Sequence, residues 1–272
     1  MTTILDRIVH DTRERLCEAK RTVSFSEWER RANELPAPRS LARALRKERL
    51  AIIAEIKKRS PSQGLLRNDF NAAQIALQYE VAGADAVSVL TEPHHFGGAL
   101  GDIESVNRHI SVPILRKDFI VDPYQIAEAR ASGADAVLLI AAVLDGSELR
   151  DLQQTADEFG LDCLVEVYDV SELKLLDFDI VKILGVNNRD LRTFDVDVER
   201  TLHILRDVPP GVIRVSESGL CSAAQLAHLW QNEVDAALIG GSLMSSGHPG
   251  HALRSLVDGL IRITPGIHVT ER

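Results

Sequence analysis

The sequence GADAV occurs at residues 83–87 and again, unchanged, at residues 133–137, and a weaker copy, VDAAL, occupies residues 234–238. Each copy lies where a helical pattern ends and a short apolar run begins. Glycine is favoured just past the end of a helix, and the small residues after it allow a helix and a strand to pack closely. A unit that recurs in this way predicts a fold built by repeating helix and strand along the chain.

Eight short apolar runs alternate with stretches that have helical spacing. The runs are unbroken rather than interleaved with polar residues, which is typical of strands buried on both faces. They cover residues 51–56, 86–90, 113–116, 136–140, 162–167, 181–186, 212–216 and 236–239. Eight strand–helix units in 272 residues favour an α/β protein with parallel strands closed into a (β/α)8 barrel, the TIM barrel. An open doubly wound sheet of about six strands is the alternative.

The chain before the first predicted strand is expected to form a helical extension. Four of its residues fall roughly on one helical face: Leu5, Ile8, Thr12 and Leu16. The Pro-Ala-Pro sequence after Leu35 ends the helical pattern, and a second short helix is predicted over residues 41–50. We therefore expect three segments, which are the extension (1–48), the barrel (49–265) and a C-terminal tail (266–272).

Composition excludes several classes of protein. The formal net charge of −9 argues against a nucleic-acid partner, because such proteins concentrate positive charge. No run approaches the roughly 18 apolar residues of a membrane helix, and the N-terminus lacks the apolar segment of a signal peptide. The three cysteines, Cys17, Cys163 and Cys221, lack metal-binding spacing and are expected to be reduced thiols of a cytoplasmic protein. The His94-His95 pair has no third ligand at a metal-site spacing, so we expect no metal.

Charged residues gather at the ends of the predicted strands. Barrels of this class have their active sites there. The set is Glu55, Lys57, Lys117, Glu166 and Glu217. Because side chains alternate along a strand, the first two are expected to point the same way, and Glu166, between two valines, is expected to face the barrel interior. Charges converging on one mouth predict an active site; a purely structural ion network is the alternative.

A phosphate site is predicted after the last two strands. Ser218-Gly219 and Gly240-Gly241-Ser242 are glycine-containing turns, and barrels often hold phosphate there on backbone N–H groups. Ser60 and Ser62, after the first strand, could add hydroxyl donors. The sequence has no GxGxxG after the first strand and no GxxxxGK[ST], which disfavours a dinucleotide or nucleoside triphosphate. A Ser-His-Asp hydrolase is also disfavoured, because no histidine ends a strand.

In these residues and in the segments around them, the sequence resembles the indole-3-glycerol phosphate synthase family. The matching segments follow one another in order over nearly the whole predicted barrel. They are IIAEIKKRSPSQG (52–64), SVLTEPHHFGG (88–98), PILRKDFIVDPYQI (113–126), ADAVLLI (134–140), LVEV (164–167), GVNNRDLRTFDVD (185–197), VSESG (215–219) and ALIGGSLM (237–244). Other phosphate-binding barrels share the last two turns but not the SPS, RKDFI and NRDL elements.

The resemblance implies a lyase of tryptophan biosynthesis. Its substrate would be the small phosphorylated molecule 1-(2-carboxyphenylamino)-1-deoxyribulose 5-phosphate, and its product indole-3-glycerol phosphate, with loss of carbon dioxide and water. It implies no cofactor and no metal, and an N-terminal extension that covers the barrel mouth. We expect a monomer or weak homo-oligomer.

The resemblance also implies roles for individual residues. Lys117 would be the general acid at the substrate ketone, and Lys57, oriented by Glu55, would bind the substrate and assist the later dehydration. Glu166 would be an acid or base near the departing hydroxyl. The substrate would be positioned by Asn187, Arg189, Glu217 and Ser218, the aromatic ring bordered by Phe96, Leu138 and Leu191, and the phosphate held by Ser60, Gly219, Gly240 and Gly241.

Two segments depart from the family pattern. After the second strand this chain has His94-His95 and then Gly97-Gly98-Ala99, which affects the expected shape of the ring pocket. After the last strand Gly241 stands where serine is common.

Two other functions are alternatives. One is the phosphoribosylanthranilate isomerase of the same pathway, which is expected to need a cysteine at a strand end. The other is a sugar-phosphate binder without catalysis.

Overall fold

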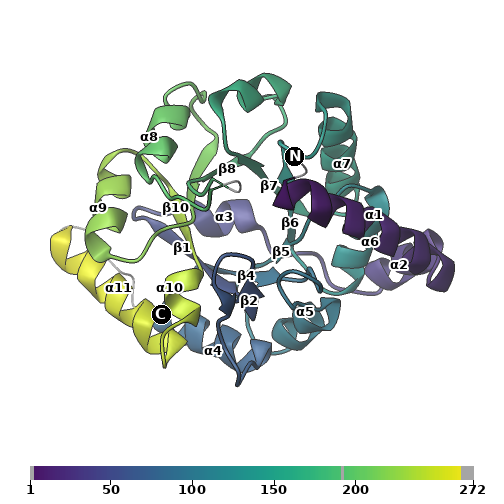
Figure 1. The fold of residues 1–272 in the computed structure, drawn as a ribbon, viewed down its shortest axis with the longest axis horizontal. Helices are drawn as coiled ribbons and strands as arrows, with labels where there is room; N and C mark the ends of the chain where they lie inside the picture. The colour runs from purple at the N-terminus through teal and green to yellow at the C-terminus, as the bar shows by residue number, and fades with distance from the viewer. Residues whose placement is uncertain (1–2, 191–192, 265–272) are drawn as a thin grey trace.

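The computed structural model describes residues 3–190 and 193–264, and its strands close into a single parallel barrel. The order around the barrel is β1-β10-β9-β8-β7-β6-β5-β4, with β4 paired to β1 (Figure 1). The barrel strands are β1 (Ala51–Ile56), β4 (Ala86–Leu90), β5 (Ile114–Lys117), β6 (Ala136–Ile140), β7 (Asp162–Val167), β8 (Ile183–Asn187), β9 (Ile213–Glu217) and β10 (Ala236–Ile239). The TIM-barrel prediction is confirmed, and the open-sheet alternative is wrong.

Helices follow the strands and cover the outside of the barrel. They are α4 (Ala72–Ala82), α5 (Leu100–Asn107), α6 (Pro123–Ala131), α7 (Gly146–Glu158), the 3₁₀ helix η1 (Val170–Leu175), α8 (Glu199–Leu205), α9 (Ala223–Gln231), α10 (Gly241–Met244) and α11 (Pro249–Ile263). Val87, Val165 and Leu184 belong to the apolar layer between strands and helices, whereas Leu115 and Leu164 belong to a second layer inside the barrel. The loop after β1 forms a small hairpin of β2 (Arg59–Ser60) and β3 (Gly64–Leu65).

Three predicted strands are displaced by one or two residues: 113–116, 181–186 and 212–216. In the structure they end later, at Lys117, Asn187 and Glu217. These polar residues stay in the parallel ladder, with Lys117 opposite Leu90 and Asn187 opposite Glu217. Pro113 has no N–H to give to the ladder, so the strand begins after it. These three polar side chains are thus part of the strands and not of loops.

The aspartate of each GADAV-type repeat joins neighbouring strands at their amino ends. Its carboxylate accepts a hydrogen bond of 2.7–2.9 Å from a backbone N–H of the adjacent strand. The pairs are Asp85 with Ile52, Asp135 with Ile114, and Asp235 with Arg214. The repeat therefore joins each strand to its neighbour at the point where the strand begins. The sequence predicted a junction between helix and strand at this place but not this hydrogen bond.

The N-terminal extension contacts both ends of the barrel. It contains α1 (Ile4–Thr22), α2 (Phe25–Asn33) and α3 (Leu41–Leu45). The buried face of α1 includes Ile8, Thr12 and Leu16, as predicted. Helix α3, seen through the ring of strands in Figure 1, packs its buried Leu41 and Leu45 against the inner layer at the amino ends of the strands.

The second predicted helix, 41–50, is too long. Helix α3 ends at Leu45, and Arg49 lies outside it. The Arg49 guanidinium donates two hydrogen bonds of 2.8 and 2.7 Å to Asp85. The chain must reach the amino end of β1 at Ala51, so it leaves the helix after Leu45. The contact between Arg49 and Asp85 then holds this segment in place of further helical turns.

Candidate active site

A cavity of about 330 Å³ opens at the carboxyl ends of the barrel strands. Every site residue expected from the sequence lines it except Leu191, which lies outside the described residues. The lining includes Glu55, Lys57, Ser60, Phe96, Lys117, Leu138, Glu166, Asn187, Arg189, Glu217, Ser218, Gly219, Gly240 and Gly241. The strand ends therefore bring the expected residues together in one place.

Strand alternation aims the charged side chains into this cavity. Val165 and Val167 are buried in the layer under the helices, so Glu166 between them faces inward. Glu55 on β1 and Lys57, the residue just past the end of that strand, also face inward, and the Lys57 ammonium donates a hydrogen bond to the Glu55 carboxylate. Both orientations were predicted, and both are confirmed.

Lys117 stands at the centre of the charged group. Its Nζ donates to Glu166 Oε2 at 3.0 Å and to Glu217 Oε2 at 2.8 Å. Burial alone would lower the pKa of Lys117, but the carboxylates of Glu166, Glu217 and Glu55 raise it above the ordinary lysine value. Lys117 is therefore a charged ammonium that can donate strong hydrogen bonds inside the cavity.

Glu217 is the carboxyl group with the most perturbed environment. Burial raises the pKa of Glu217 to about 8; the charge of Lys117 opposes this rise and that of Glu166 adds to it. Its Oε1 is buried and has no hydrogen-bond partner among the described residues. Burial therefore favours the protonated form of Glu217, whereas the ammonium of Lys117 favours its charged form.

Two glycines leave room for these carboxylates. A Cβ on Gly185 would lie 2.1 Å from Glu217 Oε1, and a Cβ on Gly240 would lie 1.9 Å from Glu55 Oε2. Gly240 was expected at the phosphate, and Gly185 was not among the expected site residues. In the structure Gly185 lies opposite Glu166 in the ladder.

Asn187 and Arg189 form the side of the cavity under β8. The Asn187 amide donates to Glu166 Oε1 at 3.2 Å, and its Oδ1 accepts from the Arg189 N–H at 3.0 Å. The Arg189 guanidinium donates to the Phe194 carbonyl oxygen at 2.9 Å. Asn187 thus orients Glu166, while Arg189 lines the cavity and also holds its own loop.

The turn after β9 has an unusual backbone. Ser218 and Gly219 have φ angles of 71° and 80°, in the left-handed region. A Cβ on Gly219 would lie 2.1 Å from Val196 Cγ1, so both backbone angle and space require glycine there. After the neighbouring strand β10, Gly240 and Gly241 begin α10, whose first N–H groups have no acceptor within the helix. These turns can receive an anion on backbone N–H groups.

The opposite side of the cavity is apolar. Phe96 and Leu138 line it as expected, together with Phe119, Ile4 and Ile8. The rings of Phe96 and Phe119 lie 6.1 Å apart, centre to centre, at an angle of 34°. Phe119, Ile4 and Ile8 were not among the site residues expected from the sequence, although Ile8 lies on the helical face predicted for the N-terminal extension.

Arg116, which precedes Lys117, does not line the cavity, and it contacts Asp118, the residue on the other side of Lys117. Arg116 is buried and donates to Asp118 Oδ2 at 3.0 Å and to Thr91 Oγ1 at 3.1 Å, and it pairs with Glu128 at 2.8 Å. Asp118 Oδ1 also accepts from the backbone N–H of Phe119 at 2.9 Å. This network, missed from sequence, fixes the end of β5 from behind.

In residues 3–190 and 193–264, no three His, Cys, Asp or Glu side chains gather closely enough to hold a metal ion. No helix in the described part of the chain is long and apolar enough to cross a membrane.

A closed parallel barrel, with an ammonium group and several carboxylates at one mouth, defines this chain as an enzyme of the TIM-barrel class. Its cavity has an apolar end and an end suited to an anion. A family model described as indole-3-glycerol phosphate synthase matches residues 5–256. The chain belongs to this family, and it is a carboxy-lyase of tryptophan biosynthesis.

Individual relatives agree with the family. An indole-3-glycerol phosphate synthase of Salinibacter ruber is 50% identical over 256 residues, covering 93% of this chain and 95% of the relative. The synthase of Aromatoleum aromaticum is 44% identical, covering 94% and 99%. Among solved structures, a tryptophan synthase alpha-subunit from Pyrococcus furiosus has a TM-score of 0.57 and 16% identity, covering 78% of this chain and 98% of that one. That likeness supports the fold alone.

The stability of the folded chain should depend on the protonation of Glu217. Between its ordinary value of 4.5 and about 8, the folded chain holds a proton here that the unfolded chain has released. The contribution to the free energy of unfolding is therefore present below about pH 4.5 and is lost as pH rises toward 8, by up to about 1.4 kcal/mol per pH unit.

Glu217→Gln should remove this dependence. Urea unfolding of both proteins at several pH values between about 5 and 8 measures it. The free energy of unfolding of the native chain, minus that of the variant, should fall as pH rises; a constant or rising difference would contradict the assignment. Glu34→Gln, at an exposed carboxylate just past the end of α2, is the matched control.

Proposed function

We propose that Lys117 is the general acid of the synthase reaction, donating its proton to the ketone oxygen of 1-(2-carboxyphenylamino)-1-deoxyribulose 5-phosphate. The observation that carries this proposal is the position of its ammonium group, 3.0 Å from Glu166 and 2.8 Å from Glu217, between the apolar and glycine-lined ends of one cavity. With the aromatic ring of the substrate at the apolar end and its phosphate at the glycine-lined end, the ketone between them would bind next to the Lys117 ammonium.

The chemistry explains why a cationic donor is needed. A ring carbon attacks the ketone carbon, and the electron pair of the carbonyl bond moves onto oxygen, which takes a proton and becomes a hydroxyl. The carboxylate then leaves as carbon dioxide, and its bonding pair returns to the ring. The hydroxyl finally takes up a proton and departs as water, the adjacent ring carbon loses a proton, and the indole double bond forms. A fixed ammonium stabilises the negative charge that develops on oxygen in the first step.

We assign the later steps to the neighbours of Lys117. Lys57, held by Glu55, binds the substrate carboxylate and phosphate region and assists the dehydration. Glu166, oriented by Asn187, exchanges the proton of the departing hydroxyl. Support comes from the contacts of Lys57 with Glu55 and of Asn187 with Glu166.

We assign the two ends of the cavity to the two ends of the substrate. The aromatic ring lies against the apolar side, and the phosphate lies on the turns after β9 and β10. Arg189, Glu217 and Ser218 position the substrate between them. The ring borders Phe96 and Leu138, with Leu191 in an undescribed part of the loop, and the phosphate contacts Ser60, Gly219, Gly240 and Gly241.

One assay tests the proposed activity directly. The purified chain is supplied with the phosphorylated substrate, and the fluorescence of the newly formed indole ring is followed. Turnover without an added metal or cofactor is expected. Absence of indole fluorescence at any enzyme concentration would refute the function.

The phosphate end has a test of its own. Gly241→Asp should raise KM about tenfold or more, because a carboxylate would face the bound phosphate across a few ångströms. A side chain fits there, since a Cβ would meet only Gln63 Oε1, at 3.2 Å. Gly247→Asp, where a Cβ meets nothing within 4 Å and which does not line the cavity, is the control. Equal KM values for the two variants would place the phosphate elsewhere.

We also propose that the chain works in the cytoplasm as a monomer or weak homo-oligomer, without nucleic acid. The net charge of −9 supports the last point. Size-exclusion chromatography with light scattering would measure the oligomeric state.

A further inference from the structure

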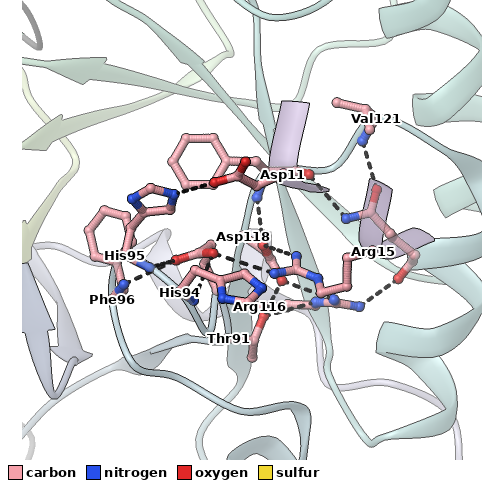
Figure 2. A network of polar contacts seen from close by, with 12 residues as sticks. Asp11, Arg15, Thr91, His94, His95, Phe96, Arg116, Asp118 and Val121 are labelled. Atoms are coloured by element: carbon pink, nitrogen blue, oxygen red, sulfur yellow. Dashed lines mark hydrogen bonds and ion pairs between the residues drawn. The ribbon is translucent and has the colours of Figure 1, made fainter. Parts of the chain in front are cut away.

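The His94-His95 pair, which departs from the family pattern, contacts the N-terminal helix. His95 Nε2 lies 2.8 Å from Asp11 Oδ2 on α1 (Figure 2). The hydrogen bond with His95 holds the pKa of the Asp11 carboxyl below its usual value. The contact therefore joins α1 to the loop after β4, two segments 84 residues apart in the chain.

The loop that carries His95 is shaped by a buried carboxylate. Glu92 accepts hydrogen bonds from the backbone N–H groups of His94, His95 and Phe96, at 3.0, 2.6 and 3.0 Å. Arg15, one turn beyond Asp11 on α1, also reaches Glu92 at 3.4 Å. Because Glu92 fixes the backbone of His95 and Phe96 together, the position of one side chain determines that of the other.

Asp11 and His95 each lie close in the chain to a residue that lines the apolar end of the cavity. Ile8, one turn before Asp11 on the same helix, lines the cavity and is buried in the inner apolar layer. Phe96 follows His95 directly, lines the same end and packs on Phe119. The contact between Asp11 and His95 therefore connects the two walls, Ile8 and Phe96, from outside.

We propose that Asp11 and His95 are positioning residues that set the spacing between Ile8 and Phe96 and so fix the aromatic end of the substrate pocket. The proposal rests on the assignment of the substrate ring to that end under the proposed function. Neither side chain lines the cavity. Each acts through its neighbour, so its loss weakens binding of the aromatic part of the substrate and leaves the proton donor in place.

Steady-state kinetics of four variants test this proposal. Asp11→Ala and His95→Ala should each raise KM about twofold to tenfold, the range expected from loss of one hydrogen bond, with kcat little changed. The double variant should be no worse than the more affected single variant, because the two changes remove the same contact. His95→Gln, whose amide can still donate to Asp11, should restore most of the affinity.

Inhibition by inorganic phosphate distinguishes a change confined to the aromatic end of the pocket from a general loss of structure around the cavity. Its inhibition constant reports the phosphate end, so it should be unchanged in all four variants. The control is His10→Ala on the solvent side of α1, where His10 pairs with Glu14 and both side chains are 71% exposed. Unchanged KM in the single variants, additive effects in the double variant, or an equal loss of phosphate inhibition would overturn the proposal. Absence of turnover in the native chain would instead refute the proposed function.

Discussion

Lys117→Met is expected to lower kcat by about a thousandfold or more, because the variant has neither the proton donor nor the positive charge that stabilises the developing oxyanion. Methionine has a similar length and no charge, so the change keeps most of the packing. It also leaves Glu166 and Glu217 without the cation that lies 3.0 and 2.8 Å from them. Indole fluorescence under saturating substrate measures the effect.

The controls separate loss of chemistry from loss of binding or folding. The phosphate end does not include Lys117, so inorganic phosphate should still bind the variant and raise its melting temperature. Lys182→Met removes a lysine that is 64% exposed and pairs with Asp157 at 3.5 Å; turnover should not change. If Lys117→Met retained turnover within about tenfold of the native chain, the assignment of the acid would be wrong.

The core of this site could be predicted because it depends on local periodicity. Lys117, Glu166 and Glu217 each lie at or near the end of a mainly apolar run, and alternation along a strand decides which way each side chain points. Parallel strands place all their carboxyl ends at one mouth, so Lys117 and Glu217, 100 positions apart, converge without further information. The same rule applied to the residue before Lys117 would have placed Arg116 outside the cavity.

The contacts that could not be predicted are those between segments with no shared periodicity. The aspartate of each repeat bonds to a strand that comes earlier in the chain, as Asp85 does to Ile52, and only the three-dimensional register brings them together. The contact of Asp11 with His95 requires the crossing position of α1, which depends on packing. Space around Gly185 likewise depends on where Glu217 lies.

The charged partners at the end of β5 explain why Lys117 can be held so firmly. Arg116 and Asp118 contact each other, and Arg116 also donates to the carbonyl oxygen of Gln125 at 2.9 Å. Burial alone would lower the pKa of Arg116, but Glu128 and Asp118 raise it, so it stays charged. The strand end is therefore fixed by ionic contacts behind it while Lys117 faces the substrate.

Arg116→Met should accordingly lower the free energy of unfolding by about 3–5 kcal/mol, the cost typical of breaking a buried ion pair by removing one partner. The loss arises because Asp118 and Glu128 keep their charges without the guanidinium, in a place where Asp118 is 2% exposed. Urea unfolding followed by circular dichroism measures it. The activity of the remaining folded protein should also fall, since the strand end that positions Lys117 loses its support.

Arg30→Met provides the matched control, because Arg30 pairs with Glu27 and Glu34 on the exposed face of α2. Loss of such surface pairs should cost less than about 1 kcal/mol. Arg116→Met combined with Asp118→Leu should cost less than the sum of the two single changes, because the second removes a charge that the first leaves unpaired. A loss at Arg116 as small as that at Arg30 would mean that water or a rearranged partner replaces the guanidinium, and that β5 does not depend on this network.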